Sequence, residues 1–458
     1  MDAAPSLHVL HTNYQSTVRQ LDYYYGLVKR QILHYQSPTI GLFPACSADT
    51  HVADLRTSVY CTMATWSLYQ AYRRIDDDHG KAYELGGSCI KCMRGILGCW
   101  MRQSPGLELF KAGQQGKFAL HSKFHLITGE EVCSTDQYEH LQLDVVAVYL
   151  IALVQLITSG LQIIYTMDEV AFVQNLVYYI ERAYRTPDFG IWERGSKYNN
   201  GTPELHASSI GMVKAALEAI NGCNLFGDRG ASWSVIFVDI DAHNRNRSIF
   251  ETLLPKESSS KSVDASLLFT ISFPSFSTHD THLYNKTKEQ IMTLLKGSYG
   301  YKRFQRDGYG CELEDKTRRH YYRGETKDFE GVECEWPMFY VLLMIEGVFK
   351  SNDKQVEECK TLLKQLVKTD KNGDSILPKY YYVPKDYIEL EKESPGSQLR
   401  VSSTVGTASN LFMMGQSLLL IADLLTHDLL HINELDPIRR YMPSYNRPRK
   451  GGRYSAFQ

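Results

Sequence analysis

Several segments of this sequence are apolar around nearly their whole helical circumference. The run Val59–Trp66 is an example, because its residues leave almost no polar face. A helix of this kind is packed on both sides, and two concentric rings of helices bury an inner helix in that way. The sequence therefore predicts an all-α fold in which outer helices enclose inner ones.

The spacing of apolar residues predicts helices along most of the chain and little strand. The predicted helices lie near residues 15–35, 58–75, 82–102, 138–159, 168–185, 204–221, 263–272, 286–297, 336–350, 354–369 and 408–430. Long connections rich in aromatic residues and glycine lie at 103–137, 186–203, 298–335 and 370–407. Because connections of this length in a compact domain are usually functional, we expect a helical barrel with its site at one rim.

No internal linker is visible, so the sequence predicts one domain over residues 21–440. It also predicts an N-terminal lead over residues 1–20 and a basic tail with Pro and Gly over residues 441–458. The 50 basic and 52 acidic side chains nearly cancel, which excludes an overall basic nucleic-acid binder. The 30 tyrosines suit sugar platforms, protein interfaces or the edges of a core.

The sequence favours a cytoplasmic protein. Met1–Leu10 lacks the basic and apolar stretches of a secretory signal, and the ten cysteines are too scattered for a disulfide scaffold. Val145–Met167 contains no charged residue, but its polar residues and the turn at Ser159-Gly160 indicate a buried helix rather than a membrane span. Tyr454–Gln458 has no cysteine four residues from the end, so no prenylation motif is present.

Cys89 and Cys92 form a single C-x-x-C spacing. A zinc site would need a second pair or histidines at ligand spacing, and none follows. Both thiols share one helical face with Met93, Leu97 and Trp100, so we interpret them as buried. We expect no metal site and no cofactor.

The segment Asp188–Gly195 places Trp192 beside Glu193 on a loop that leaves a helix. Sugar chemistry uses this combination, because an indole can stack on a pyranose and raise the pKa of a neighbouring acid. The alternative is an ordinary Trp anchor next to a surface pair of Glu193 and Arg194.

Two further segments are candidates. Glu333–Phe339 opens a helix with an early proline, and capping by its acids is a sufficient explanation. Leu377–Pro384 contains Tyr380, Tyr381 and Tyr382 in a row, which could stack on a glucan or on a partner subunit.

Longer motifs resemble the regulatory α and β chains of phosphorylase kinase. These motifs are Tyr35–Pro44, Ala71–Asp78, Lys91–Leu97, Ser159–Ile164, Asp188–Gly195, Arg306–Tyr309 and Glu333–Pro337. Three more motifs favour the β type, namely Glu193–Gly201, Ala219–Gly222 and Val238–Arg247.

The N-terminal half of that family resembles the glucoamylase-type (family 15) glycoside hydrolases, which implies an (α/α)6 toroid. By this resemblance the general acid falls on Glu193, and the substrate-holding Arg-Asp pair falls on Arg56 and Thr57. The general base falls on Lys379. An inverting hydrolase needs two carboxylates, so the resemblance implies a degenerate site without catalytic residues. A possible sugar groove would keep Arg56, Trp192, Glu193, Tyr380 and Tyr381.

The resemblance therefore implies a non-catalytic β-type regulatory subunit that restrains the catalytic γ kinase in the control of glycogen breakdown. Its expected partners are the α, γ and calmodulin-like δ chains. Family members can also be lipid-anchored at the inner face of the plasma membrane. The alternatives are a module that binds glycogen through a degenerate groove and, disfavoured by Thr57 and Lys379, an active glucan hydrolase. The family's calmodulin-binding segments lie in further C-terminal domains, and the basic tail lacks the amphipathic pattern of a calmodulin target.

Overall fold

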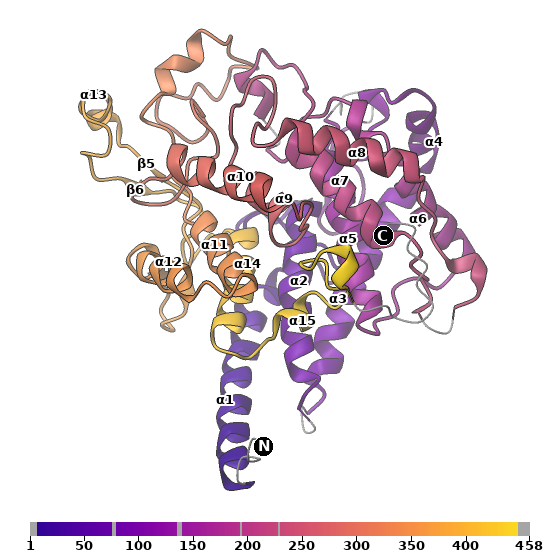
Figure 1. Cartoon of the computed structure of the whole chain (residues 1–458). Coiled ribbons are helices and arrows are strands. Elements are labelled where there is room, and N and C mark those ends of the chain that lie inside the picture. The colour runs from indigo at the N-terminus through magenta and orange to yellow at the C-terminus, as the bar shows by residue number, and fades with distance from the viewer. Residues whose placement is uncertain (1–6, 76–78, 135–139, 193–194, 228–229, 448–458) are drawn as a thin grey trace.

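The computed structural model describes residues 7–75, 79–134, 140–192, 195–227 and 230–447. Six helices form a closed inner ring, in which each helix contacts the next and the last contacts the first. In ring order they are α2 (Leu55–Tyr72), α5 (Leu143–Thr158), α7 (Ala207–Ile220), α9 (Leu267–Ile271), α11 (Met338–Phe349) and α14 (Met413–Thr426). The ring confirms the predicted all-α fold with enclosed inner helices (Figure 1).

An outer helix precedes each inner helix in the chain. The outer helices are α1 (Leu7–Gln31), α3 (Lys81–Met101), α6 (Met167–Ile180), α8 (Ile240–Leu253), α10 (Thr281–Leu294) and α12 (Asp353–Leu366). The N-terminal part of α1 extends away from the body of the molecule (Figure 1). This alternation of outer and inner helices gives the six hairpins of an (α/α)6 toroid.

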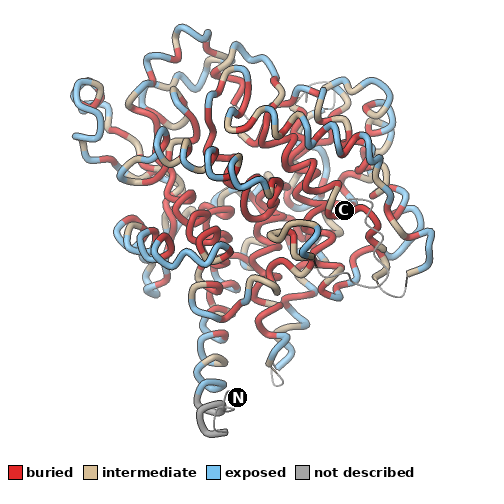
Figure 2. Tube along the Cα trace, viewed as in Figure 1, coloured by how far each residue is buried: buried red, intermediate tan, exposed pale blue. Residues whose placement is uncertain are grey.

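Burial separates the two rings. In α2 every residue except Tyr69 is buried, and in α7 every residue except Glu218. The outer helices instead bury one face and expose the other (Figure 2). Some polar groups within the inner ring are satisfied locally, as where the Thr65 and Ser417 hydroxyls donate to the carbonyls of Cys61 and Met413. The core is therefore the contact zone between the rings and the space inside the inner ring.

The toroid also carries short helices and short strands. The short helices are α4 (Ser104–Gly113), α13 (Ile388–Glu393) and α15 (Ile432–Leu435). Three antiparallel pairs join β1 (Val52–Asp54) to β2 (Lys123–His125), β3 (Lys368–Thr369) to β4 (Ser375–Ile376), and β5 (Tyr381–Tyr382) to β6 (Val401–Ser402). These pairs fasten the connections between helices, and each contributes at least one buried side chain to the core, such as Phe124 of β2 and Ile376 of β4.

Four helices of the structure were not predicted from the sequence, namely α4, α8 and the short α13 and α15. α4 lies inside the predicted connection 103–137, and α8 was not among the predicted helices. Pro105, Gly106 and Gly113 hide α4, since proline and glycine normally indicate loops. α8 is rich in Asp, Asn and Arg and has little apolar periodicity. Both α4 and α8 cover the body rather than fill it.

Both predicted chain ends contain ordered structure. α1 begins at Leu7, so residue 21, the predicted start of the domain, lies inside a helix. The described part of the predicted tail, residues 441–447, packs on the toroid, where the Arg447 guanidinium pairs with the buried Glu218 carboxylate. The Tyr441 hydroxyl donates to Asn433 at 2.8 Å.

The buried cysteines agree with the sequence interpretation. Cys89 and Cys92 are fully buried free thiols whose Sγ atoms donate to the carbonyls of Thr62 and Ser58. Burial raises the pKa of Cys92 to about 12. The turn at Ser159-Gly160 ends α5 as predicted, with Gly160 in the left-handed region at φ 100°.

One close approach gives a stability prediction. A Cβ atom on Gly95 of α3 would lie 2.0 Å from the Ile40 carbonyl oxygen, whereas a Cβ atom on Gly98 of the same helix would meet nothing within 4 Å. We expect Gly95→Ala to lower the free energy of unfolding by about 1–3 kcal/mol through overpacking. Gly98→Ala, the matched control, should raise it by about 0.5–1 kcal/mol through helix propensity. Urea denaturation of the two variants measures the difference, and equal stabilities would contradict the packing described here.

Candidate functional site

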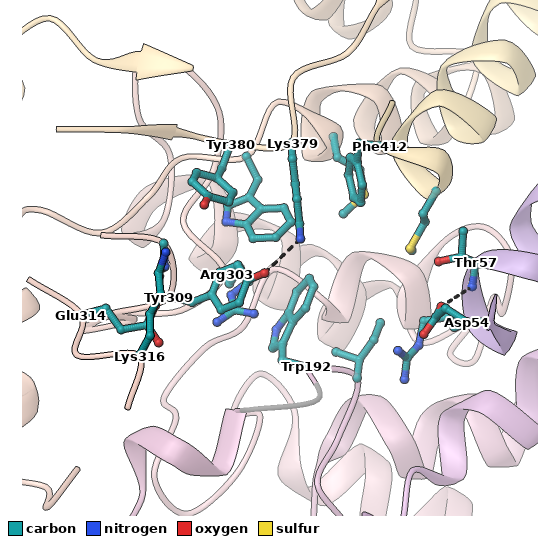
Figure 3. A pocket seen from close by; sticks show the side chains of 16 residues that line it. Asp54, Thr57, Trp192, Arg303, Tyr309, Glu314, Lys316, Lys379, Tyr380 and Phe412 are labelled. Carbon is teal, nitrogen blue, oxygen red and sulfur yellow. Dashed lines mark hydrogen bonds between the residues drawn. The ribbon is translucent and has the colours of Figure 1, made fainter. Parts of the chain in front are cut away.

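A cavity of about 440 Å³ lies at the N-terminal ends of inner helices α2, α11 and α14 (Figure 3). Its lining residues are Asp54, Arg56, Thr57, Ile191, Trp192, Arg303, Tyr309, Gly310, Glu314, Lys316, Trp336, Met338, Lys379, Tyr380, Phe412 and Met414. Three of the four long connections predicted to carry a site contribute to this lining: 186–203, 298–335 and 370–407. The site therefore lies at one rim of the toroid.

The Arg303 guanidinium lies among the aromatic walls. Its Cζ atom is 4.4 Å from the ring centroid of Tyr309, 4.8 Å from that of Trp192 and 5.5 Å from that of Trp336. Behind these rings the guanidinium donates two hydrogen bonds to Asp307, at 2.5 and 2.7 Å, and both side chains are almost fully buried. Burial alone would lower the pKa of Arg303, but the Asp307 carboxylate raises it. The pair thus fixes the rings in place and is internally neutral.

Trp192 is oriented by the protein. Its indole N–H lies 3.0 Å from both carboxylate oxygens of Asp264, and Asp264 also accepts from the Ser266 amide. The ring centroid of Trp192 is 5.8 Å from that of Trp336. Trp192 is therefore a fixed, partly exposed wall of the cavity.

The described lining contains two carboxylates, and both accept hydrogen bonds from the protein. Asp54 caps α2 by accepting from the Thr57 amide at 2.8 Å. Glu314 accepts from the Gly310 amide at 3.0 Å and from Lys197 and the Tyr198 hydroxyl at 2.9 Å. Burial acts to raise the pKa of Glu314, but these three donors hold it below its ordinary value. Glu314 is therefore an ionised structural acceptor rather than a proton donor.

Arg56 lies at the start of α2 and is held from behind. Its Nε and Nη2 donate to the Asp144 carboxylate at 2.8 and 3.0 Å, and Asp144 belongs to α5. This ion pair is buried and links two neighbouring inner helices. Thr57, the next residue, lines the cavity without a carboxylate of its own.

Lys379 extends its ammonium group into the cavity. Its Nζ atom donates to the Tyr309 hydroxyl at 2.9 Å. The same atom lies 5.2–5.8 Å from the ring centroids of Tyr309, Trp336 and Phe412. Figure 3 shows it between these rings, apart from Asp54.

The three consecutive tyrosines do not share one surface. Tyr380 lines the cavity, and burial raises its pKa. Tyr381 is outside the described lining: it is buried, packs on Tyr299 at 5.0 Å between ring centroids, and donates its hydroxyl to the Leu366 carbonyl. Extended backbone points successive side chains to opposite faces, so the predicted pairing of both rings in one groove does not hold in this geometry.

The remaining candidates are Glu193, Arg194 and the acids of the segment Glu333–Phe339. Glu193 and Arg194 lie outside the described residues. The acids of Glu333–Phe339 do not cap α11: Glu333 binds Lys302 and the Arg306 amide, while Glu335 binds the Tyr299 amide and Arg400. The capping interpretation is therefore wrong, because these carboxylates tie down neighbouring loops.

Several lining residues were not among the predicted site residues, namely Asp54, Arg303, Tyr309, Glu314, Lys316, Trp336 and Phe412. Tyr309 and Trp336 do lie in motifs identified in the sequence, and those motifs could have marked both residues as candidates for the site. Among the described residues no group of His, Cys, Asp and Glu is arranged to hold a metal ion. None of the described helices combines the length and apolar character needed to cross a membrane.

The family model "Glycosyl hydrolases family 15" matches residues 18–455. The chain therefore belongs to glycosyl hydrolase family 15, in agreement with its toroid and rim cavity.

Among curated proteins, the chain is similar to the probable phosphorylase b kinase regulatory subunit beta of Drosophila melanogaster, with 63% identity over 98% of this chain and 40% of that protein. The probable alpha subunit of the same organism is 45% identical over 94% of this chain and 34% of that protein. The mouse skeletal muscle alpha isoform is 46% identical with the same coverage. The chain thus spans well under half the length of these relatives, and the match to the beta type is the stronger one.

Among solved structures, a wild-type glycosidase superposes with a TM-score of 0.62 at 16% identity, covering 93% of this chain and all of that one. A variant glycosidase in complex with glucose gives a TM-score of 0.61 at 17% identity with the same coverage. At this level of identity the likeness shows the fold alone.

The buried pair under the aromatic walls gives a prediction. Arg303→Met leaves the Asp307 carboxylate buried without its cation, and we expect a loss of about 3–5 kcal/mol in the free energy of unfolding. Arg247→Met breaks the exposed pair with Glu251 on α8 and should cost about 0.3–0.5 kcal/mol. Urea denaturation compares the two variants. A loss below 1 kcal/mol for Arg303→Met would show that Asp307 is not held as described.

Proposed function

We propose that this chain is part of a β-type regulatory subunit of phosphorylase kinase, acting in the cytoplasm without hydrolysing glucans. The observation that carries this proposal is the 63% identity over 98% of the chain to a protein named as the beta subunit. Identity to the named alpha subunits is 45–46%. A gap of that size, over nearly the same residues, favours the β type.

The proposed partners are the α chain, the γ kinase chain and the calmodulin-like δ chain. The proposed action is restraint of the γ kinase within that complex, and through it control of glycogen breakdown. We infer that residues 21–440 form the glucoamylase-like unit, with the helical segment 7–20 extending α1 outward from it (Figure 1).

The charges around the cavity support a non-hydrolytic role. Inverting hydrolysis needs one carboxylic acid and one free carboxylate across a water. Asp54 and Glu314 are both bound by the protein, and Lys379 occupies the position to which the resemblance assigns the base. An ammonium group cannot accept a proton, so the contribution of about 10²–10⁴ from general base catalysis is lost.

A second function is favoured by the cavity walls, namely sugar binding in the same groove. Trp192, Tyr309, Trp336 and Tyr380 present ring surfaces to a volume of about 440 Å³, within the range of small-molecule sites. Aromatic faces stack on the apolar faces of pyranose rings. Recognition of a glucan can therefore persist after hydrolysis is lost, and both functions can belong to one chain.

Assembly is tested by co-expression with the α, γ and δ chains followed by affinity capture of this chain. We expect stoichiometric recovery of at least one partner, because the proposal places contacts with partner chains on the toroid, which makes up most of the chain. A family 15 glucoamylase carrying the same tag is the matched negative control, since it shares the fold. Capture of no partner by the folded chain, under conditions in which a full-length beta subunit captures all three, would contradict the regulatory proposal.

Hydrolysis is tested with maltooligosaccharides and a glucose-release assay. We expect no release above background, because Lys379 occupies the position to which the resemblance assigns the base. Glu193→Gln controls for a contaminating hydrolase, since a trace activity that this substitution leaves unchanged does not come from the groove. Release that is abolished by Glu193→Gln and lies within about tenfold of a glucoamylase would show that the groove is catalytic.

A further inference from the structure

Lys379 is a cation without a carboxylate partner among the described residues. Its ammonium group donates to the neutral Tyr309 hydroxyl and otherwise lies near aromatic rings. Ring faces attract the cation only weakly compared with an ionised acceptor. One or two N–H groups of Lys379 therefore remain available to a ligand that enters the cavity.

The other ionised groups inside the cavity, apart from Lys316 at its mouth, have partners in the protein. The pairs are Arg56 with Asp144, Arg303 with Asp307, and Glu314 with Lys197. Asp54 is bound to the amide of Thr57 and lies across the cavity from Lys379 (Figure 3). Lys316, at the mouth, is exposed and makes no ion pair in the described part of the chain. The charge left uncompensated at the Lys379 end is therefore positive.

The helix arrangement adds to this positive charge. Met338 and Met414 of the lining belong to the first turns of α11 and α14, so both helices begin at the cavity. Neither N-terminus carries a side-chain cap. The N-terminal end of a helix carries a partial positive charge, which favours an anion in the space in front of it.

We propose that the groove binds a glucosyl unit carrying a phosphate monoester, with the phosphate at Lys379 and the sugar ring against Trp192 and Tyr380. This inference rests on the proposed sugar groove and specifies its ligand. A phosphate monoester carries about −1.5 to −2 charges near pH 7 and three acceptor oxygens. A neutral glucan would leave the Lys379 ammonium without an ionised acceptor. The phosphate could belong to a free hexose phosphate or to a phosphorylated glucan end.

The test is isothermal titration of the folded chain with glucose, glucose 6-phosphate, glucose 1-phosphate, inorganic phosphate and a maltooligosaccharide phosphorylated at its non-reducing end. We expect at least one sugar phosphate to bind about tenfold or more tightly than glucose and than inorganic phosphate. Comparison of the free hexose phosphates with the phosphorylated oligosaccharide distinguishes the two sources.

Lys379→Met should remove that preference, because it keeps the length of the side chain and deletes the charge. Lys371→Met, at an exposed turn outside the cavity lining, is the matched control and should change nothing. Tyr309→Phe removes the hydroxyl that positions Nζ and serves as a second variant if Lys379→Met unfolds. It should weaken sugar phosphate binding several-fold more than it weakens glucose binding.

Each other outcome overturns the inference in a recognisable way. Equal binding of glucose and its phosphates, unaffected by Lys379→Met, would leave the sugar groove standing and refute the phosphate. Inorganic phosphate binding as tightly as the sugar phosphates would indicate an anion site without sugar recognition. Binding of none of the ligands would refute the sugar groove as well, while the regulatory proposal would still stand or fall on the capture of partner chains.

Discussion

The nearly complete burial of the six inner helices is the constraint on which the rest of this structure depends. Their polar side chains are mostly Ser and Thr, which donate to carbonyls of the preceding turn. Such a core has no place for an unpaired charge, because each buried ion costs several kcal/mol to desolvate. Ionised groups within the inner helices are therefore paired, as Lys214 is with Glu218 in α7, and a ligand can meet the chain's charges at the rim.

At the rim, charge pairing determines the shape of the groove. The Arg303–Asp307 pair holds three rings around one guanidinium, and the Arg56–Asp144 pair joins α2 to α5 beneath the cavity floor. Because these groups satisfy one another, they position the walls without offering charge to a ligand. The ammonium group of Lys379 differs from these pairs, because it contacts aromatic rings and the Tyr309 hydroxyl and has no carboxylate partner among the described residues.

The sequence predicted the elements that have a periodic pattern of apolar residues. It did not predict the features that depend on contacts between distant segments. The wholly apolar run in α2 indicated a buried inner helix, and the long connections indicated the rim. α8 was missed because its Asp, Asn and Arg residues carry little apolar periodicity. Arg303 and Asp307 lie in a connection with no periodic signal, so their pairing is visible once the chain is folded. The different fates of Tyr380 and Tyr381 follow from the alternation of extended backbone, which a period-two analysis of the segment could have found.

This fold could lose hydrolysis and keep ligand recognition with few changes in its residues. Binding area comes from aromatic rings fixed by Asp264 and Asp307, and these contacts do not depend on the identity of residue 379. Catalysis depends on the charge there, because a base must accept a proton and an ammonium group cannot. On the function proposed above, a lysine at the position of the base would remove the chemistry while keeping the walls, and it would change which ligands the groove prefers. A family 15 toroid would in this way become a regulatory module whose occupancy reports on a metabolite rather than consuming it.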